Sequence, residues 1–300
     1  MRIDALLKQG IEQLEKAGVG SPRLNAELLL MHAAGCDRTA LLAHPERELS
    51  AGQSATYEAW LHERAAGKPA QYITGHQEFW GLEFLVNPSV LIPRPETELL
   101  VETTLEFART GQGINQSSGS TLTIADVGTG SGCIAVALAK ELPAARIYAL
   151  DNSQEALSTA RRNAERNLGT GDLGGGNGAR IHFLHSDLLK PISGEVLPTF
   201  DLIVSNPPYV SERDFPYVMV EVRKHEPPSA VFAGESGVEV YERLIPQAVQ
   251  ALRKDGLMIL ELGYDVRERV RSLLLPEHWT DIDWRKDLAG IIRAVIARRK

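Results

Sequence analysis

Four consecutive residues combine a side-chain amide, two prolines and an aromatic ring: Asn206, Pro207, Pro208 and Tyr209. The nitrogen of a planar amide or aromatic amine is a weak nucleophile, because its lone pair is delocalised. The Asn206 side-chain oxygen and the Pro207 carbonyl can each accept one N–H of such a group and aim its nitrogen at an electrophile. The prolines stiffen the loop and remove donors, and Tyr209 offers a flat face to a planar group and favours a nearby positive charge. A proline-stiffened loop without a catalytic role is the alternative interpretation.

A glycine-rich turn provides a second candidate site, made of Gly128, Thr129, Gly130, Ser131 and Gly132. Glycines let the backbone turn sharply and let a ligand approach the amide groups. The turn does not match a dinucleotide-binding fingerprint, because Cys133 stands where that motif has its last glycine. It does not match a phosphate-binding loop either, because no Lys-Ser/Thr pair follows. The spacing therefore suits a nucleoside with an amino-acid tail, although the motif alone is also compatible with a plain tight turn.

Two aspartates at the ends of predicted strands extend this second site. Asp151 follows the glycines by about twenty residues and can accept hydrogen bonds from both hydroxyls of a ribose. Asp187 ends a further strand and is placed to accept from the amino group of an adenine. The alternative roles are a helix N-cap for Asp151, which Asn152 or Ser153 can fill instead, and a surface carboxylate for Asp187. A sulfonium methyl donor held here, opposite Asn206, would complete an in-line methyl transfer with no metal or general base at the moment of attack.

The elements that must position these residues alternate between strand and helix, which is typical of a doubly wound α/β sheet. Predicted strands are 122–127, 146–150, 180–185, 200–205 and 257–262, with a final pair at 279–284 and 291–297. Predicted helices are 134–142, 154–167, 238–252 and 266–275. In such a sheet the strand before Asn206 lies beside the strand before Gly128, where strand order reverses and ligands bind. We therefore expect both motifs to face one crevice.

The first ninety residues have a different organisation. Amphipathic spacing predicts a helix that begins at Pro22 with Ser21 as its N-cap. Residues 78–86 are predicted to form a β-hairpin that turns at Gly81. Further helices are expected over 1–18, 52–67 and 96–108. We expect an N-terminal helical domain, a hairpin linker and an α/β catalytic domain, at residues 1–75, 76–92 and 93–300.

Composition excludes several classes of protein. The chain is 43% hydrophobic and 24% charged, as globular proteins are, and no apolar run is long enough to span a membrane. Asp4 interrupts the start of the chain, so we expect no secretory signal and a cytoplasmic protein. The net charge of −7 argues against tight binding to nucleic-acid phosphates.

Other catalytic and metal-binding patterns are incomplete. Cys36 and Cys133 lie too far apart for a disulfide framework or a structural zinc site, and a packed side chain is expected at Cys133. The Gly-Glu-Ser-Gly run at 234–237 lacks the final glycine of a nucleophile elbow. His182 and His185 are three apart on a predicted strand, which puts them on opposite faces, so we expect no metal.

Longer motifs identify a family. The glycine turn and Asp151 resemble the cofactor motifs of class I S-adenosylmethionine-dependent methyltransferases, and Asn-Pro-Pro-Tyr matches enzymes that methylate planar nitrogens. Further motifs recur in order at 21–24, 71–75, 78–82, 91–98 and 226–227. Together they are similar to the HemK/PrmC family of protein-(glutamine-N5) methyltransferases, which act on peptide chain release factors. The match covers nearly the whole chain, and the run Ile-Pro-Arg-Pro-Glu-Thr-Glu is specific to this group.

This resemblance implies a Rossmann-like class I fold and methylation of the glutamine in a release factor's Gly-Gly-Gln motif, with S-adenosyl-L-methionine as the donor. Asn206 and Pro207 would hold the glutamine amide, with Pro208 and Tyr209 against it, and the N-terminal domain would contact the release factor. The cofactor would be bound by the glycine turn, both aspartates, Leu188 and Asn206. Some members have an aromatic residue in place of Leu188, so here the adenine must be stacked less strongly or held by other groups.

Two other functions compete with this interpretation. A methyltransferase for exocyclic amines of DNA or RNA shares the Asn-Pro-Pro-Tyr motif, but the acidic balance and the lack of a large basic recognition domain argue against it. A non-catalytic cofactor-binding partner of translation factors is the third candidate, and Asn206→Ala distinguishes it, because cofactor binding should persist while transfer is lost. The Gly/Ser/Asn-rich stretches 111–120 and 169–178 are expected to be surface loops without a role in activity.

Overall fold

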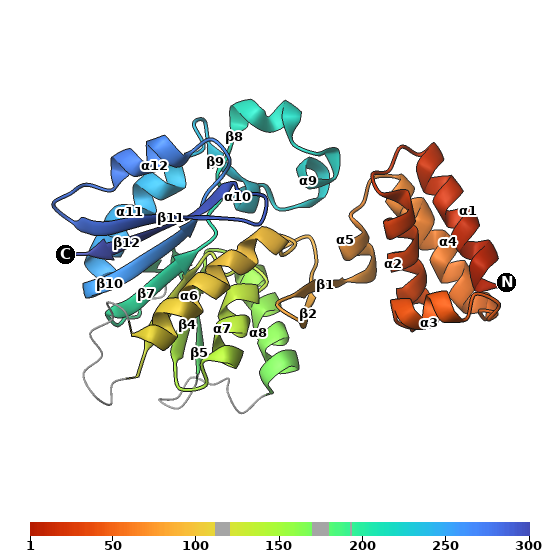
Figure 1. Ribbon diagram of the computed structural model, residues 1–300, viewed down its shortest axis with the longest axis horizontal. Coiled ribbons are helices and arrows are strands. Elements are labelled where there is room, and N and C mark those ends of the chain that lie inside the picture. The colour runs from red at the N-terminus through yellow and green to blue at the C-terminus, as the bar shows by residue number, and fades with distance from the viewer. Residues whose placement is uncertain (112–120, 170–179, 193) are drawn as a thin grey trace. The chain divides into compact units, whose positions relative to one another are not determined.

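The computed structural model of the 300-residue chain describes residues 1–111, 121–169, 180–192 and 194–300 (Figure 1). The chain divides into two compact units, formed by residues 1–76 with 219–225 and by residues 77–218 with 226–300. The two glycine-rich stretches predicted as surface loops lie, apart from their first residues, outside the described residues. No helix in the described ranges has the length and apolar character that crossing a bilayer requires.

The first unit is helical and comprises α1 (Ile3–Lys16), α2 (Pro22–Ala34), α3 (Arg38–Ala43), α4 (Ala51–Ala65), α5 (Ala70–Thr74) and α9 (Val220–His225). Helices α1 and α4 come so close that a Cβ at Gly10 would lie 2.0 Å from the Tyr57 hydroxyl oxygen. Tyr57 is fully buried in the same apolar cluster as Leu14. Arg64 of α4 pairs with Glu221 and so links α9 to the other helices of this unit.

The predicted helices of this unit are present, with one correction at the start of α2. Ser21 does precede Pro22 at the N-cap position, but its φ is +48° and its side chain makes no capping hydrogen bond. Instead, the side-chain amide of Asn25 donates to the carbonyls of Gly20 and Ser21. The predicted N-cap position of Ser21 is therefore confirmed, but the capping bond expected from its hydroxyl is absent, and side chain to backbone bonds from Asn25 within the helix hold this turn instead.

The second unit contains the predicted doubly wound sheet, with strand order β11-β12-β10-β7-β3-β4-β5-β6. The parallel strands are β3 (Thr123–Val127), β4 (Arg146–Asp151), β5 (Ile181–Asp187), β7 (Phe200–Ser205) and β10 (Leu252–Glu261). The antiparallel strands are β6 (Lys190–Pro191), β11 (Trp279–Lys286) and β12 (Ile292–Arg299), which confirms the predicted final pair. Strand β7 lies beside β3, so the order reverses between them as predicted.

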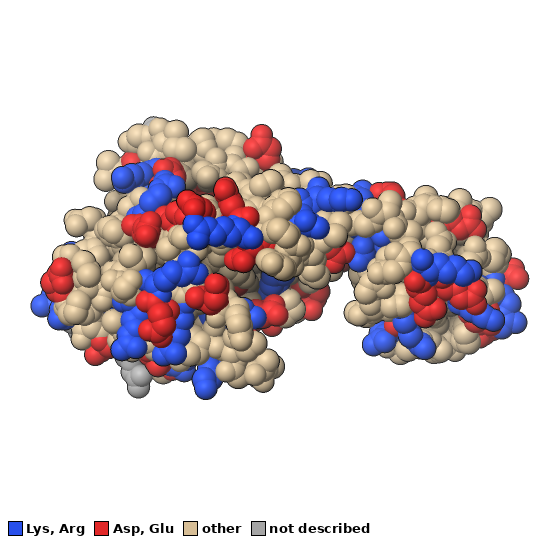
Figure 2. All heavy atoms as spheres, turned by 90° about the horizontal axis from the view of Figure 1, so that it is seen from above, with Lys and Arg blue, Asp and Glu red and all other residues tan. Residues whose placement is uncertain are grey.

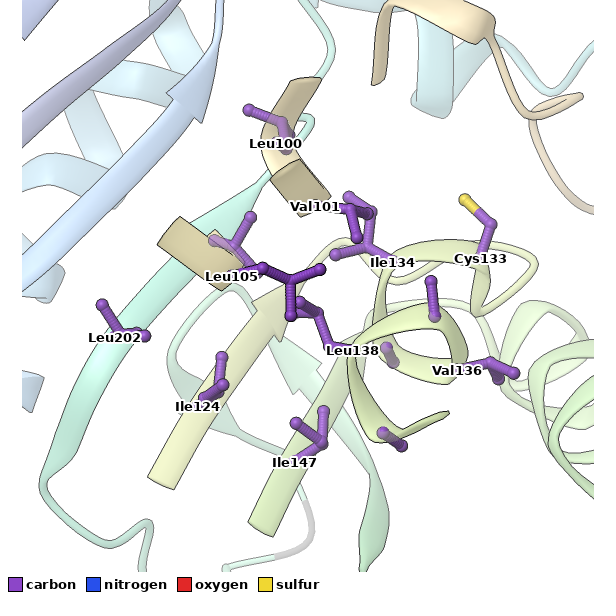
Figure 3. Packing of buried hydrophobic residues seen from close by; sticks show 14 of the residues in the cluster. Leu100, Val101, Leu105, Ile124, Cys133, Ile134, Val136, Leu138, Ile147 and Leu202 are labelled. Carbon is purple, nitrogen blue, oxygen red and sulfur yellow. The ribbon is translucent and has the colours of Figure 1, made fainter. Parts of the chain in front are cut away.

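Helices cover both faces of this sheet and bury two apolar clusters. One face is covered by α6 (Glu98–Thr110), α7 (Cys133–Glu141) and α8 (Gln154–Leu168), the other by α11 (Glu239–Ala251) and α12 (Arg267–Leu273) (Figure 1). Successive residues of β7 alternate between the clusters: Leu202 and Val204 belong to the first, and Ile203 to the second. Figure 3 shows side chains of α6 and α7 facing those of β3, β4 and β7 in the first cluster. This packing fixes the strand ends that carry both motifs.

Short elements complete the second unit. Strands β1 (His76–Phe79) and β2 (Leu82–Leu85) form the predicted hairpin, and Trp80 and Gly81 at its turn have φ of +54° and +65°, as a primed two-residue turn requires. The Asn163 side chain of α8 bonds both the amide and the carbonyl of Leu85, at 2.7 and 2.9 Å, and so replaces a strand neighbour. The remaining elements are η1 (Pro95–Thr97), β8 (Val210–Ser211), η3 (Glu212–Tyr217), α10 (Pro228–Val231) and β9 (Phe232–Gly234).

Candidate active site

Backbone hydrogen bonds hold the turn between β3 and α7 against the neighbouring strand. The amides of Gly128 and Thr129 both donate to the carbonyl of Leu150, at 2.8 and 2.9 Å. Gly128, Gly130 and Gly132 have φ of +73°, +54° and +81°, a conformation that favours glycine. At Gly132 a Cβ would also lie 3.0 Å from a side-chain atom of α8. The glycine turn is therefore a rigid wall made of backbone.

Asp126 supports this turn from inside the sheet. One of its carboxylate oxygens accepts from the Thr129 hydroxyl at 2.6 Å and from the Ala135 amide at 3.1 Å. Asp126 is fully buried, and burial raises its pKa to about 7. The Thr129 hydroxyl is thus directed at Asp126, which leaves the backbone of the turn for a ligand.

Asp151 ends β4 beside the glycine turn. Its Oδ2 accepts from the Gly130 amide at 2.8 Å, and its Oδ1 accepts from the Ser153 amide at 2.9 Å. Burial raises the pKa of this carboxyl, against the lowering effect of those amide bonds. The N-cap of α8 is Ser153, whose hydroxyl accepts from the Ala156 amide. Asp151 is therefore not the helix cap, and its remaining lone pairs are available to a ligand.

Asp187 and Leu188 lie where β5 ends, and α11 holds this loop through two side chains. The Arg243 guanidinium donates to both carboxylate oxygens of Asp187, in one case at 2.6 Å. Gln247, one turn further along α11, accepts from the Leu189 amide at 3.0 Å. Leu188 itself has φ of +56°. The carboxylate predicted to contact adenine is thus already paired with an arginine, and its predicted role stays a prediction.

The Asn206 loop follows β7 and is held by a chain of side-chain hydrogen bonds. Asn206 Nδ2 donates to Thr97 Oγ1 at 2.9 Å, and the Thr97 hydroxyl donates to Glu261 Oε2 at 2.7 Å. Thr97 and Glu261 are each 2% exposed, and burial raises the pKa of Glu261 to about 7. The hydroxyl of Ser205 ties the end of β7 to the carbonyl of Val127, at 2.7 Å. The amide oxygen of Asn206 is the part of this side chain that remains for a ligand.

Tyr209 packs behind this loop. A Cβ at Gly263 would lie 2.7 Å from Tyr209 Cδ2, so the aromatic ring rests on the bare backbone that follows β10. The Tyr209 hydroxyl donates to Glu261 Oε1 at 3.4 Å, and burial raises the pKa of the phenol. A Cβ at Gly237 would lie 2.7 Å from the Tyr209 carbonyl oxygen. Two glycines from separate segments thus leave room for one tyrosine.

An ion pair between a half-buried arginine and a buried glutamate holds the segment before η1. Glu226, which is 4% exposed, accepts from the Arg94 guanidinium and from the Ile92 amide, the latter at 3.3 Å. A buried carboxylate without such partners would be costly, so this pairing stabilises the backbone of 92–94. Pro93 and Arg94 belong to the wall of the cavity described next.

A cavity of about 540 Å³ lies at the carboxyl ends of the parallel strands. Its lining contains most residues of both predicted sites: Gly128, Thr129, Gly130, Ser131, Asp151, Asp187, Leu188, Asn206 and Pro208. The glycine turn and Asn206 thus face one crevice, as predicted. Among the predicted residues, Gly132, Pro207 and Tyr209 do not line it, because Gly132 faces α8, Pro207 is buried and the Tyr209 ring lies against Gly263.

Sequence reasoning missed the residues that support the site, namely Thr97, Arg94, Glu226, Arg243 and Glu261. Thr97, Arg94 and Glu226 were inside motifs, at 91–98 and 226–227, that were recognised only as family signatures. Glu261 carried a readable signal, because it is a carboxylate in an otherwise apolar predicted strand, and such a residue needs partners. No comparable local signal marked Arg243, which lies on the half-exposed side of an amphipathic helix.

The remaining candidate groups have ordinary structural partners. His182 stacks on Tyr148 with ring centroids 4.7 Å apart, whereas His185 contacts the Asn152 carbonyl at 3.0 Å. Cys133 is buried at the start of α7, and burial raises the pKa of its thiol to about 12. In the part of the chain that the structure describes, no group of three or more His, Cys, Asp or Glu is placed to hold a metal.

The parallel sheet, the glycine turn and the acceptor loop at the switch point define a class I methyltransferase. Residues 5–75 match the PrmC N-terminal domain family, and residues 112–222 match the Methyltransferase small domain family. A release factor glutamine methyltransferase from Koribacter versatilis is 44% identical over 299 residues, which cover 100% of this chain and 99% of that protein. A protein of the same name from Nitratidesulfovibrio vulgaris is 38% identical, over 99% of this chain and 95% of that protein. One from Coxiella burnetii is 39% identical, over 93% of this chain and 92% of that protein. The chain belongs to the release factor glutamine methyltransferase family.

A solved structure agrees on the fold. The hMettl16 catalytic domain, crystallised in complex with the MAT2A 3'UTR hairpin 6, superimposes with a TM-score of 0.50 at 17% identity. The match covers 82% of this chain and 81% of that chain. At this identity the likeness concerns the fold alone, which is the predicted α/β methyltransferase fold.

Proposed function

We propose that this enzyme transfers a methyl group from S-adenosyl-L-methionine to the side-chain amide nitrogen, N5, of the glutamine in the Gly-Gly-Gln motif of peptide chain release factors, and so modulates translation termination. Family membership supports the substrate class, since the relatives are named for it. One observation carries the proposal. The NH2 group of Asn206 donates to Thr97, which leaves its oxygen to accept an N–H from a substrate amide.

The residues of the cavity fit S-adenosyl-L-methionine. The Asp151 carboxylate accepts hydrogen bonds from backbone amides, those of Gly130 and Ser153 among them, and its two oxygens together have about four lone-pair sites, so acceptor capacity remains for a ribose. A Cβ at Gly128 would meet nothing within 4 Å, so the backbone there borders open space. The volume also lies in the usual range for small-molecule sites. When bound there, S-adenosyl-L-methionine supplies an electrophilic methyl carbon, and its sulfur leaves as the neutral thioether of S-adenosyl-L-homocysteine.

The acceptor loop supplies the positioning. The Asn206 oxygen and the Pro207 carbonyl each accept one N–H of the glutamine amide, which fixes its nitrogen toward the methyl carbon. One face of the Tyr209 ring rests on Gly263, and we propose that the other supports the planar amide. The amide nitrogen forms the new N–C bond as the S–C bond breaks, and it loses one proton to water, which leaves a neutral N-methyl amide.

The N-terminal helical unit is the proposed contact region for the release factor. It matches a family defined by this domain, and the catalytic unit alone accounts for the cavity. The domain limits at residues 75 and 92, the cytoplasmic location and the lack of direct nucleic-acid contact remain predictions from the sequence.

Methylation of DNA or RNA amines is not favoured. The chain has a net charge of −7, and Figure 2 shows basic and acidic side chains interspersed over the face in view. Several arginines of the catalytic unit form ion pairs within it, as in the pairs Arg243–Asp187 and Arg253–Asp201. Phosphate binding needs clustered unpaired basic groups instead.

A methylation assay with three acceptors tests the proposal. The enzyme is incubated with labelled S-adenosyl-L-methionine and a release factor, the same factor with its Gly-Gly-Gln glutamine changed to alanine, or a mixture of DNA and RNA. We expect label only in the unmodified release factor, and one added methyl on the glutamine in a peptide mass spectrum. Label in nucleic acid, or equal label in the altered factor, would overturn the proposal.

A further inference from the structure

We infer that Thr97 and Glu261 are positioning residues for methyl transfer: they form a hydrogen-bond relay that determines which end of the Asn206 amide faces the substrate. The inference rests on the proposed function and extends it to two residues that are not proposed to touch the glutamine amide. Thr97 borders the cavity, whereas Glu261 lies behind it.

The first observation is that the Thr97 hydroxyl is not used as a helix cap. Thr97 occupies the N-cap position of α6, where a threonine side chain commonly accepts from a backbone amide of the first turn. Here it makes no capping bond. Its hydroxyl lies between Asn206 and Glu261 instead, at 2.9 and 2.7 Å. The side chain is 2% exposed, so these two partners account for its position.

The second observation is the direction of the hydrogen bonds. A threonine hydroxyl has a single proton, and Thr97 gives it to the Glu261 carboxylate. Thr97 can therefore offer only lone pairs to Asn206, and only the NH2 end of the Asn206 amide can bond to it. The carbonyl end is then left beside the cavity. The acceptor that the glutamine N–H requires is thus set by a carboxylate two side chains away.

The third observation is that Glu261 is itself held in place. Its backbone carbonyl accepts from the buried Tyr241 hydroxyl at 2.7 Å, and its second carboxylate oxygen accepts from Tyr209. One carboxylate therefore supports both Asn206, through Thr97, and the aromatic ring of the same loop. Without this acceptor the Thr97 proton could bond to the Asn206 oxygen, and the amide could turn its NH2 group toward the substrate. Two N–H donors would then face each other.

Substitutions at Thr97 test the relay with a matched control. Thr97→Val keeps the shape of the side chain and removes the hydroxyl, whereas Thr97→Ser keeps the hydroxyl. Thr104→Val makes the same change at another buried threonine, whose hydroxyl donates to the carbonyl of Leu100 in its own helix. We expect Thr97→Val to lower kcat by about 100-fold, with KM for the release factor and Kd for the cofactor within threefold. Thr97→Ser and Thr104→Val should retain kcat within about threefold.

Substitutions at Glu261 provide a second, independent test. Glu261→Gln retains an oxygen that accepts from Thr97, so we expect most of kcat to remain. Glu261→Leu removes the acceptor and should lower kcat as Thr97→Val does. Because both changes break one relay, the double variant Thr97→Val/Glu261→Leu should be little worse than either single variant.

The outcomes separate this inference from the proposed function. If the wild-type enzyme does not methylate the release factor, the proposed function fails. If the wild type is active, either of two results refutes the relay. One is a kcat for Thr97→Val equal to that of Thr104→Val, and the other is a loss of kcat in Thr97→Ser as large as in Thr97→Val. Thermal unfolding and cofactor Kd identify any misfolded variant. If a Thr97 variant is misfolded, the two Glu261 variants decide the outcome, because equal kcat values for Glu261→Gln and Glu261→Leu refute the relay.

Discussion

The two walls of the cavity are built in different ways. The glycine wall is contiguous in sequence and is held by backbone bonds to β4, with Asp151 at the end of the same strand. The acceptor wall depends on side chains from three distant segments, which meet at Thr97, Asn206 and Glu261. A backbone wall presents a surface to bind a ligand, whereas a chain of side chains sets the direction of one acceptor. Substitutions in the glycine wall should therefore change the affinity for the cofactor, and substitutions in the acceptor wall should change the rate of methyl transfer.

The largest effect is expected from Asn206→Ala. Loss of the side-chain acceptor leaves the glutamine nitrogen unaligned, and removal of one aligned hydrogen-bonding group in an active site commonly lowers rate by a factor of about 10³. Cofactor Kd should change by less than about threefold, because the glycine wall is intact. Methyl transfer is measured at saturating substrates and cofactor binding by calorimetry.

The control for this variant is Asn167→Ala, which removes an asparagine that bonds backbone carbonyls away from the cavity. Its rate should match that of the wild type. An unchanged rate in Asn206→Ala would show that this amide does not hold the substrate.

The reciprocal effect is expected from Asp151→Ala. The variant loses the acceptor for a ribose and also the partner of the Gly130 amide, so cofactor Kd should rise by about 100-fold. At saturating cofactor, kcat should stay within about fivefold, because the acceptor wall is unchanged. Asp287→Ala serves as the control, since Asp287 also accepts backbone amides but does so in a loop outside the cavity. A large loss of kcat with unchanged Kd would contradict the division of roles between the walls.

A smaller effect is expected from Gly263→Ala. The added Cβ would lie 2.7 Å from the Tyr209 ring, so the ring must shift and the acceptor loop with it. We expect kcat to fall by about tenfold with cofactor Kd unchanged, because misplacement of reacting groups lowers rate more than binding. Gly52→Ala is the matched control, since a Cβ there meets nothing within 4 Å. If both variants keep the wild-type kcat, the Tyr209 position does not matter for transfer.

The same contrast explains what could be predicted from the sequence. The glycine wall is local, so its turn and Asp151 could be recognised from spacing alone, and strand β7 has the predicted limits. The acceptor loop was recognised too, but its support was not, because Thr97 and Glu261 are 164 residues apart and meet only in the folded chain. Asp187 at the end of β5 illustrates the same limit, since its partner Arg243 lies on α11, 56 residues further along the chain.

The predicted boundaries of an element were wrong where tertiary packing overrides the local sequence pattern. Strand β10 begins at Leu252, directly after α11, although the charged residues that follow Leu252 indicate a loop until residue 257. Pairing of Leu252 with Phe200 extends the strand, and an irregular register absorbs the polar residues. At Ser21 the local pattern was right about position but wrong about the bond that holds it.

The smallest effect on activity is expected from Asp126→Asn, which tests whether the glycine wall depends on buried charge. Burial raises the pKa of Asp126 from 3.8 to about 7, so the folded protein binds a proton that the unfolded chain releases. The free energy of unfolding should then fall as pH rises from 3.8 to about 7, because the native state holds more protons across this window.

Asparagine keeps an acceptor for Thr129 and for the Ala135 amide and does not titrate, so the variant should lose that part of the pH dependence. The difference in unfolding free energy between wild type and variant should change by on the order of 2 kcal/mol between pH 5 and pH 8, measured by denaturant unfolding, while methyl transfer stays within about threefold. Equal pH dependence of the unfolding free energy in both proteins would show that folding does not raise the pKa of Asp126.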